Sequence, residues 1–226
     1  MNIAKPSTMA MDKLLTIAHK VYKNKQIKVV FEFGARYGED TIEFAQRLPH
    51  SQIYTFECNE QTIPQCRDLI KQFSNITLTE KAICESDGPI TFYPIDAKKT
   101  TTTWKDGNQG ASSLLKASGK YPIENYVQDE KIVSGITLKT FMQENDINKI
   151  DIMWMDIQGA ELMALKGLQD RISDVGIFHI EVEFFEIYSR QPLFKDLRNY
   201  LESKGFEFKG FTTKSEYSAD AIFINR

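Results

Sequence analysis

The sequence predicts an α/β fold, in which a mostly parallel, doubly wound sheet carries helices on both faces. Three observations lead to this expectation. A short apolar segment runs into a glycine turn and a helix start at 28–41, segments rich in β-formers alternate with amphipathic ones, and several predicted strands end in a carboxylate. Strands that alternate with helices are typical of parallel sheets, because a crossover helix must return the chain to the edge where the next strand begins. With 226 residues, 42% of them hydrophobic, the chain is long enough for one such domain, or for two small ones.

One helix is predicted before the sheet begins. Apolar residues recur at helical spacing between Met9 and Tyr22, which indicates an amphipathic helix. We expect residues 1–26 to form an N-terminal helical segment and residues 27–226 to form the domain that carries the site.

The segment 28–41, KVVFEFGARYGEDT, predicts the first strand, a ligand-binding turn and a helix start. Gly34 and Gly38 let the backbone approach a ligand closely, and the free N–H groups of the helix start point towards it. The spacing Glu32-x-Gly34-x-x-x-Gly38 is not the Gly-x-Gly-x-x-Gly of a dinucleotide site, and the Gly-Lys-Ser/Thr of a phosphate loop is missing. An acid at the strand end suits a ligand with a positive charge and hydroxyls, such as S-adenosylmethionine (SAM). An ordinary strand-to-helix turn is the alternative.

The second predicted strand, 52–56, ends at Glu57, which follows Glu32 by 25 residues. A carboxylate roughly 20 residues after the first turn binds ribose hydroxyls in nucleotide folds. We therefore expect Glu57 to bind a ribose; the alternative is a solvated charge at a strand end. A branched side chain at Gly34 is expected to weaken SAM binding and to leave the fold largely intact.

The rest of the chain continues the alternation. Helices are predicted at 41–48, 64–73, 137–145, 159–168 and 192–203, and strands at 76–80, 90–93, 150–155, 175–182, 206–211 and 219–224, with a short apolar segment at 82–84. The last two strands are close enough in sequence to pair antiparallel.

Residues 94–131 form a long irregular segment with a threonine run, Trp104 and several glycines. Loops of this length inside a compact domain are usually functional. We expect this segment, 94–131, to be an active-site insert that lies where the substrate enters and is mobile without substrate. The alternative is a flexible surface loop with no role in the site.

Four predicted strands end in carboxylates, which are Glu32, Glu57, Asp156 and Glu181. Ligands of such sheets bind outside the carboxyl ends of the strands. Acids that converge at one edge repel one another unless a cation or hydroxyls lie among them. A sulfonium ligand and a polyhydroxylated substrate would meet that requirement.

Composition argues against several other classes of function. A net charge of -3 and a pI of about 5.7 disfavour binding to DNA or duplex RNA. The three cysteines lack zinc-like spacing and are odd in number, so we expect a reducing, cytoplasmic location. No apolar run approaches the roughly 18 residues of a membrane span, and residues 1–25 are too polar for a signal peptide.

Several segments together resemble the FkbM-type family of SAM-dependent methyltransferases. They are FEFGARYG (31–38), TFECN (55–59), AICESDGPITFY (82–93), GASSL (110–114), ITLKTF (136–141), DIMWMDIQGAELMALKG (151–167) and IEVEFFEIYSRQPLF (180–194). The resemblance implies a Rossmann-like class I methyltransferase fold, with a seven-stranded sheet whose last strand is antiparallel. It also implies O-methylation of a hydroxyl on a sugar, nucleotide sugar or oligosaccharide, with a polyketide-like small molecule or the ribose of RNA as alternatives. A non-catalytic binding module with the same fold is a third possibility, and the oligomeric state stays open.

The resemblance assigns the cofactor residues. The first turn is expected to hold the methionine part of SAM, Glu57 the ribose, and the 82–83 segment the adenine. The full expected set is Glu32, Gly34, Ala35, Tyr37, Gly38, Thr41, Glu57, Cys58, Ala82, Ile83 and Asp156. This chain has Glu32 where the family usually has Asp, Arg36 where it has Asn, and Gln158 where it has Glu. Gln158 removes a carboxylate that a divalent cation would favour, so we expect no metal.

Asp156 is the first candidate for the base that accepts the proton of the acceptor hydroxyl, because it ends a strand at the ligand edge. Alternatively it bonds only the Gly159 turn or the SAM amino group. Glu181 and His179 are second candidates, since residues two apart on a strand share a face. Contacts with the acceptor are expected from four residues, which are Ser112, Ser113, Tyr188 and Arg190. For Tyr188 and Arg190, the sequence is equally compatible with a place on a surface loop that does not contact the acceptor.

Overall fold

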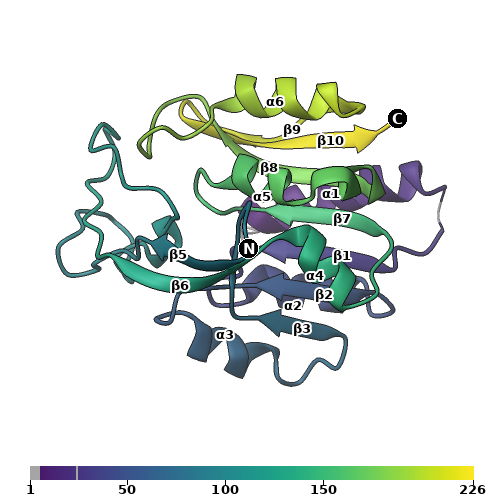
Figure 1. The fold of residues 1–226 in the computed structure, drawn as a ribbon, viewed down its shortest axis with the longest axis horizontal. Helices are drawn as coiled ribbons and strands as arrows, with labels where there is room; N and C mark the ends of the chain where they lie inside the picture. Colours follow the sequence, from purple (N-terminus) through teal and green to yellow (C-terminus); the bar gives the residue numbers. More distant parts are fainter. Residues whose placement is uncertain (1–5, 24) are drawn as a thin grey trace, which may run out of the picture.

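A seven-stranded sheet forms the middle layer of the molecule in the computed structural model, which describes residues 6–23 and 25–226 (Figure 1). The strand order is β3-β2-β1-β7-β8-β10-β9. The strands are β1 (Val29–Phe33), β2 (Gln52–Phe56), β3 (Ile76–Thr79), β7 (Ile150–Met155), β8 (Val175–Glu183), β9 (Phe206–Lys214) and β10 (Ser218–Asn225). The five strands from β3 to β8 are parallel, and β10 runs antiparallel to both its neighbours. This confirms the predicted sheet, including its reversed last strand.

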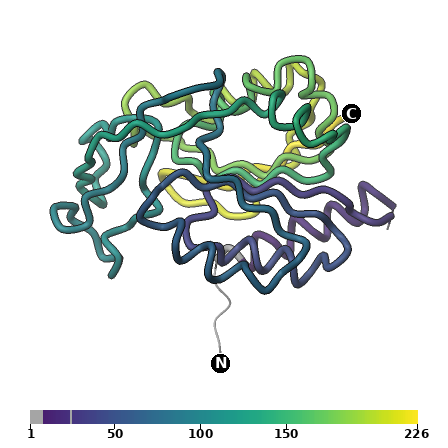
Figure 2. The backbone as a smooth tube through the Cα atoms, turned by 60° about the horizontal axis from the view of Figure 1, so that its bottom comes forward, coloured from purple at the N-terminus to yellow at the C-terminus, as the bar shows by residue number. Residues whose placement is uncertain are grey.

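Helices cover both faces of the sheet, as Figure 2 shows. One face carries α1 (Pro6–Val21), α2 (Glu39–Arg47) and α3 (Ile63–Ile70), and the other carries α4 (Leu138–Glu144), α5 (Glu161–Gly167) and α6 (Phe194–Ser203). Each helix turns an apolar stripe towards the sheet; Leu14 of α1 and Leu165 of α5, for example, are fully buried. α1 packs into the same core as β1 and β2, and residues 1–5 and 24 of the expected N-terminal segment lie outside the described residues. None of the helices in residues 6–23 and 25–226 is long and apolar enough to cross a membrane.

A second, smaller sheet stands beside the carboxyl ends of the main strands (Figure 1). It contains β4 (Ala82–Ile83), β6 (Lys131–Ile136) and β5 (Gly88–Phe92) in that order. The sequence did not predict β6, because its exposed residues follow no clear alternation and continue the irregular insert. The insert itself is mostly irregular, as predicted. It folds back on itself through isolated bridges such as Thr101 with Asn125, and contains one 3-10 turn, η1 (Gln109–Ala111).

The register of the parallel strands aligns the ends of β1, β2 and β7 with Ile180 of β8, which continues to Glu183. Phe33 is paired with Phe56 and with Met155, and Met155 is paired with Ile180. The residues that follow these four positions therefore form one row along the edge of the sheet. In spatial order, the row consists of Glu57, Gly34, Asp156 and Glu181.

Candidate active site

A cavity of about 350 Å³ lies at this edge, between the strand ends, the small sheet and the insert. Its volume lies within the range typical of small-molecule sites, roughly 300–1,000 Å³. All four residues of the row line it, together with Cys58, Asn59, Ala82, Ile83 and insert residues from Trp104 to Tyr126. The cavity therefore runs from the ends of β2 and β4 on one side to the ends of β7 and β8 on the other.

Gly34 directly follows β1 and lies inside the row, beside Asp156, which directly follows β7. Its φ of +84° is in the left-handed region, and a Cβ atom there would lie 1.9 Å from the carbonyl oxygen of Asp156. The backbone N–H groups of Gly34 and Ala35 both donate to the carbonyl of Phe56, at 3.1 Å each. This geometry argues against the expectation that a branched side chain here leaves the fold largely intact, because the side chain would force the two segments apart.

Glu57 organises the turn that follows β1. Its carboxylate accepts hydrogen bonds from the backbone N–H groups of Arg36 (2.6 Å), Asn59 (2.7 Å) and Cys58 (2.8 Å). Burial raises the pKa of Glu57 to about 7, while these three bonds act in the opposite direction. A carboxylate has about four lone-pair sites, so Glu57 keeps room to accept a further hydrogen bond from a ligand hydroxyl in the cavity.

The opposite end of the row is acidic. Asp156 is exposed to the cavity at the end of β7, and Glu181 and Glu183 line the wall beside it. Burial, followed by the neighbouring Asp156 charge, raises the pKa of Glu181 well above its usual value. Gln158 lies among these acids and donates hydrogen bonds to both Asp156 and Glu181.

Comparison with known proteins identifies the family. Residues 32–208 match the methyltransferase FkbM domain. The chain belongs to this family. It is 24% identical over 177 residues to the 2-O-methyltransferase NoeI of Sinorhizobium fredii, covering 77% of this chain and 71% of that protein. It is also 24% identical over 184 residues to methyltransferase 1 of Beauveria bassiana, covering 78% and 71%.

Solved methyltransferase structures share the fold. The N-terminal domain of EvdMO1 with S-adenosylhomocysteine (SAH) bound aligns with a TM-score of 0.50 and 13% identity, covering 99% of this chain and 82% of that one. Magnesium protoporphyrin IX methyltransferase (ChlM) from Synechocystis PCC 6803, with SAM bound, aligns with a TM-score of 0.50 and 12% identity, covering 97% and 81%. The class I methyltransferase fold and SAM as the cofactor of the family are thereby confirmed.

Among the residues predicted to contact SAM, six line the cavity and five do not. Those in the wall are Gly34, Glu57, Cys58, Ala82, Ile83 and Asp156; those outside it are Glu32, Ala35, Tyr37, Gly38 and Thr41. Glu32 is only 2% exposed and accepts hydrogen bonds from the hydroxyls of Thr41 (2.5 Å) and Thr55 (2.9 Å). It supports the turn after β1 from behind, because it is two residues before Gly34 and bonds to Thr41 of α2. Burial raises its pKa to about 8.

His179 is not at the site, which corrects its prediction as an alternative base. It is 1% exposed, its ring stacks on Trp154 with a centroid separation of 3.9 Å, and Nε2 lies 2.7 Å from the hydroxyl of Thr212. Burial lowers its pKa to about 3, so the ring is neutral at ordinary pH. It shares a face of β8 with Glu181 but lies two residues below the edge, within the core.

The four residues predicted to contact the acceptor have different positions. Ser112 and Ser113 line the cavity, and the hydroxyl of Ser113 donates to the carbonyl of Gln158 at 2.7 Å. Tyr188 is fully buried, and its hydroxyl lies 2.8 Å from both the Gln158 Oε1 and the Ala111 carbonyl. Arg190 is exposed away from the cavity lining. The prediction that Tyr188 and Arg190 contact the acceptor is therefore corrected, because neither reaches the cavity wall.

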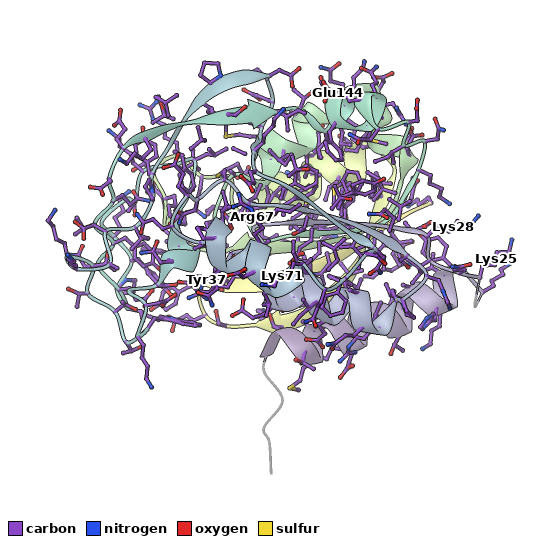
Figure 3. All side chains as sticks on the ribbon, turned by 90° about the horizontal axis from the view of Figure 1, so that it is seen from below. Lys25, Lys28, Tyr37, Arg67, Lys71 and Glu144 are labelled. Atoms are coloured by element: carbon purple, nitrogen blue, oxygen red, sulfur yellow. The ribbon has the colours of Figure 1, made fainter. Side chains whose placement is uncertain are left out.

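The insert contributes residues that the sequence did not assign to the site. Arg36, in the first turn, pairs with Asp106 and lies 5.1 Å from the ring centroid of Trp104. The hydroxyl of Tyr37 donates to the same Asp106 carboxylate at 3.0 Å; Figure 3 shows Tyr37 on the side of α3 that faces the insert. Tyr126 and Trp104 line the cavity. Local sequence contained no signal for these contacts except the aromatic residues in the insert.

Within the described residues, no group of three or more His, Cys, Asp or Glu side chains is arranged to hold a metal ion.

Proposed function

We propose that this chain is a SAM-dependent O-methyltransferase whose acceptor is a hydroxyl of a neutral sugar or glycan. The observation that carries the proposal is the row of Glu57, Gly34, Asp156 and Glu181 along one cavity, with the Glu57 carboxylate at one end and the acids Asp156 and Glu181 at the other. The cofactor, when bound, supplies an electrophilic methyl group.

The residues present suit this cofactor. Glu57 would accept a hydrogen bond from a ribose hydroxyl at the lone-pair site that its three backbone donors leave free. Ala82 and Ile83 offer an apolar wall for the adenine, and the turn at Gly34 gives the backbone access that the methionine part needs.

Asp156 would accept the proton of the acceptor hydroxyl. It is the most exposed acid at the end of the row, in the same cavity and next in line to Gly34. Alignment of the reacting atoms can supply several kcal/mol of barrier reduction, and a positioned base typically adds about 10²–10⁴-fold in rate. The chain would thus act by binding and orienting the acceptor and by removing one proton.

The charge and aromatic content of the wall favour a neutral saccharide. Tyr121, Tyr126 and Trp104 offer flat apolar faces, and Trp104 is 54% exposed. The acids of the wall, Glu57, Glu124, Asp156, Glu181 and Glu183, outnumber its two cations, Arg36 and Lys81, and Arg36 is already paired with Asp106. Because Arg36 is engaged with Asp106, the wall offers little positive charge to the diphosphate of a nucleotide sugar or to the backbone of RNA. The 2-O-methyltransferase activity named for NoeI supports methyl transfer to a hydroxyl oxygen.

A reducing, cytoplasmic location goes with this proposal. It is supported by the cysteines, because Cys58, Cys66 and Cys84 are all free and two of them are buried.

The test is methyl transfer from radiolabelled SAM to a panel of neutral oligosaccharides, nucleotide sugars, RNA and polyketide-like alcohols. We expect turnover with a neutral saccharide. Asp156→Asn should lower kcat on that acceptor by about 10²-fold or more, with little change in SAM affinity by calorimetry. The matched control is Asp68→Asn, since the Asp68 side chain is 80% exposed on α3. Normal turnover of Asp156→Asn would remove the assignment and make Glu181 the next candidate.

A further inference from the structure

Gln158 links the two acids at the catalytic end of the cavity. Its side-chain nitrogen lies 2.7 Å from Oδ1 of Asp156 and 2.6 Å from Oε2 of Glu181. A primary amide has two N–H hydrogens, so it can donate one to each carboxyl group. The chain thus joins two neighbouring acids through a neutral donor instead of a cation.

The orientation of the amide is determined by its surroundings. Its Oε1 lies 2.8 Å from the hydroxyl of the fully buried Tyr188, which is at the same distance from the Ala111 carbonyl. With the amide reversed, the carbonyl oxygen would face two carboxyl groups, which is electrostatically unfavourable. The Gln158 side chain is therefore held on one side by Tyr188 and on the other by the acid pair.

The backbone at Gln158 is also held in an uncommon conformation. Its φ is +56°, in the left-handed region, and the next residue, Gly159, has a φ of +92°. The hydroxyl of Ser113 donates to the Gln158 carbonyl at 2.7 Å and holds this turn from the insert side. A non-glycine residue persists in the left-handed region only where its environment holds it, and such residues cluster at functional sites. The turn directs the Gln158 side chain back over the ends of β7 and β8.

We infer that Gln158 is a positioning residue, which holds Asp156 and Glu181 as a pair that shares one proton and leaves one oxygen of Asp156 free for the acceptor hydroxyl. Only the statement that one oxygen of Asp156 is free for the acceptor hydroxyl rests on the proposed function. Two carboxylates this close repel each other, and the pair relieves the repulsion when one member keeps a proton. Burial and the Asp156 charge favour the proton on Glu181, whose pKa is raised.

The groups around this pair are acids and phenols. Those that interact with it are Glu161 of α5, Glu183 of β8, Asp220 of β10, Tyr121 and Tyr126 of the insert, and Tyr188. No Lys, Arg or His side chain of the described residues forms an ion pair with Asp156 or Glu181. Any further negative charge at position 158 would therefore make the pair hold its proton to a higher pH.

Two substitutions with side chains close to Gln in size test whether Gln158 positions the acid pair or only fills space between the two acids. Gln158→Glu removes both donors and adds a charge, whereas Gln158→Leu removes both donors and adds none. For Gln158→Glu we expect kcat at pH 7.5 to fall about 10-fold or more and to recover at higher pH, with the ascending limb of the pH–rate profile moved up by about one pH unit. Gln158→Leu should lower kcat with a smaller displacement of the limb. Identical pH profiles for both variants and wild type would overturn the inference.

A second measurement needs no acceptor. Carbon-13 NMR of chain labelled at the Glu side-chain carboxyls follows the titration of Glu181, which the Glu181→Gln variant assigns. We expect its midpoint to rise by about one pH unit in Gln158→Glu, with thermal unfolding as the check that both variants are folded. An unchanged midpoint in folded Gln158→Glu would overturn the role of Gln158 whatever the acceptor is. A raised midpoint in a chain that methylates nothing on the panel would instead leave that role standing and refute the proposed function.

Discussion

Replacing Gly34 by Ala tests whether the edge of the sheet depends on a close approach of β1 and β7. The added Cβ would lie 1.9 Å from the Asp156 carbonyl oxygen and 3.0 Å from its carbon. Since Cβ atoms do not approach other heavy atoms within 3.0 Å, the two segments must separate by about 1 Å. Overpacking of this kind costs about 1–3 kcal/mol, and the φ of +84° adds about 1–2 kcal/mol for a residue with a Cβ. We expect the free energy of unfolding to fall by about 2–5 kcal/mol.

The matched control is Gly205→Ala, after α6. Gly205 has a φ of +92°, and nothing lies within 4 Å of the position that its Cβ would take. That variant carries the conformational cost without the clash, so it should lose only about 1–2 kcal/mol. Urea unfolding of both variants without SAM measures the difference. If Gly34→Ala is no less stable than Gly205→Ala, the close approach of the strands does not constrain position 34 and our reading of the turn is wrong.

Three further variants test the cofactor site, the buried acid behind it and the contact with the insert. Glu57→Ala should weaken SAH binding by about 10–100-fold in calorimetry, because hydrogen bonds to a charged group are lost; Glu60→Ala, an exposed neighbour, should not. Burial raises the pKa of Glu32 from 4.5 to about 8, so the folded chain keeps a proton that the unfolded chain has lost, and the free energy of unfolding should fall as pH rises through that window. Glu32→Gln cannot ionise, and urea midpoints at several pH values should show a shallower decline; an unchanged slope would contradict the assignment. Arg36→Ala loses the Asp106 pair and the Trp104 contact and should raise the acceptor KM about 5-fold or more, while an unchanged KM would mean that the insert needs no anchor.

The sequence alone determined the alternation of strands and helices, the order of the motifs and the family. Strand and helix periodicity depend on neighbouring residues, so the strands of the main sheet were predicted within a few residues. The convergence of Glu57, Asp156 and Glu181 on one edge was also predictable, because the carboxyl ends of parallel strands meet at the same edge of a sheet. By contrast, β6 has no clear pattern of its own and forms only because β4 and β5 lie beside it.

Tertiary structure alone decided which strand-end residues face the cavity and which are enclosed. Glu32 points under α2 and His179 lies in the core, although Glu32 is two residues before Gly34 and His179 is two residues before Glu181. The contacts of Gln158 with Glu181 and Tyr188, and of Arg36 with Asp106, join residues 23 to 70 positions apart in the chain. Such contacts depend on how helices, loops and strands pack in three dimensions, and local propensity carries no information about them.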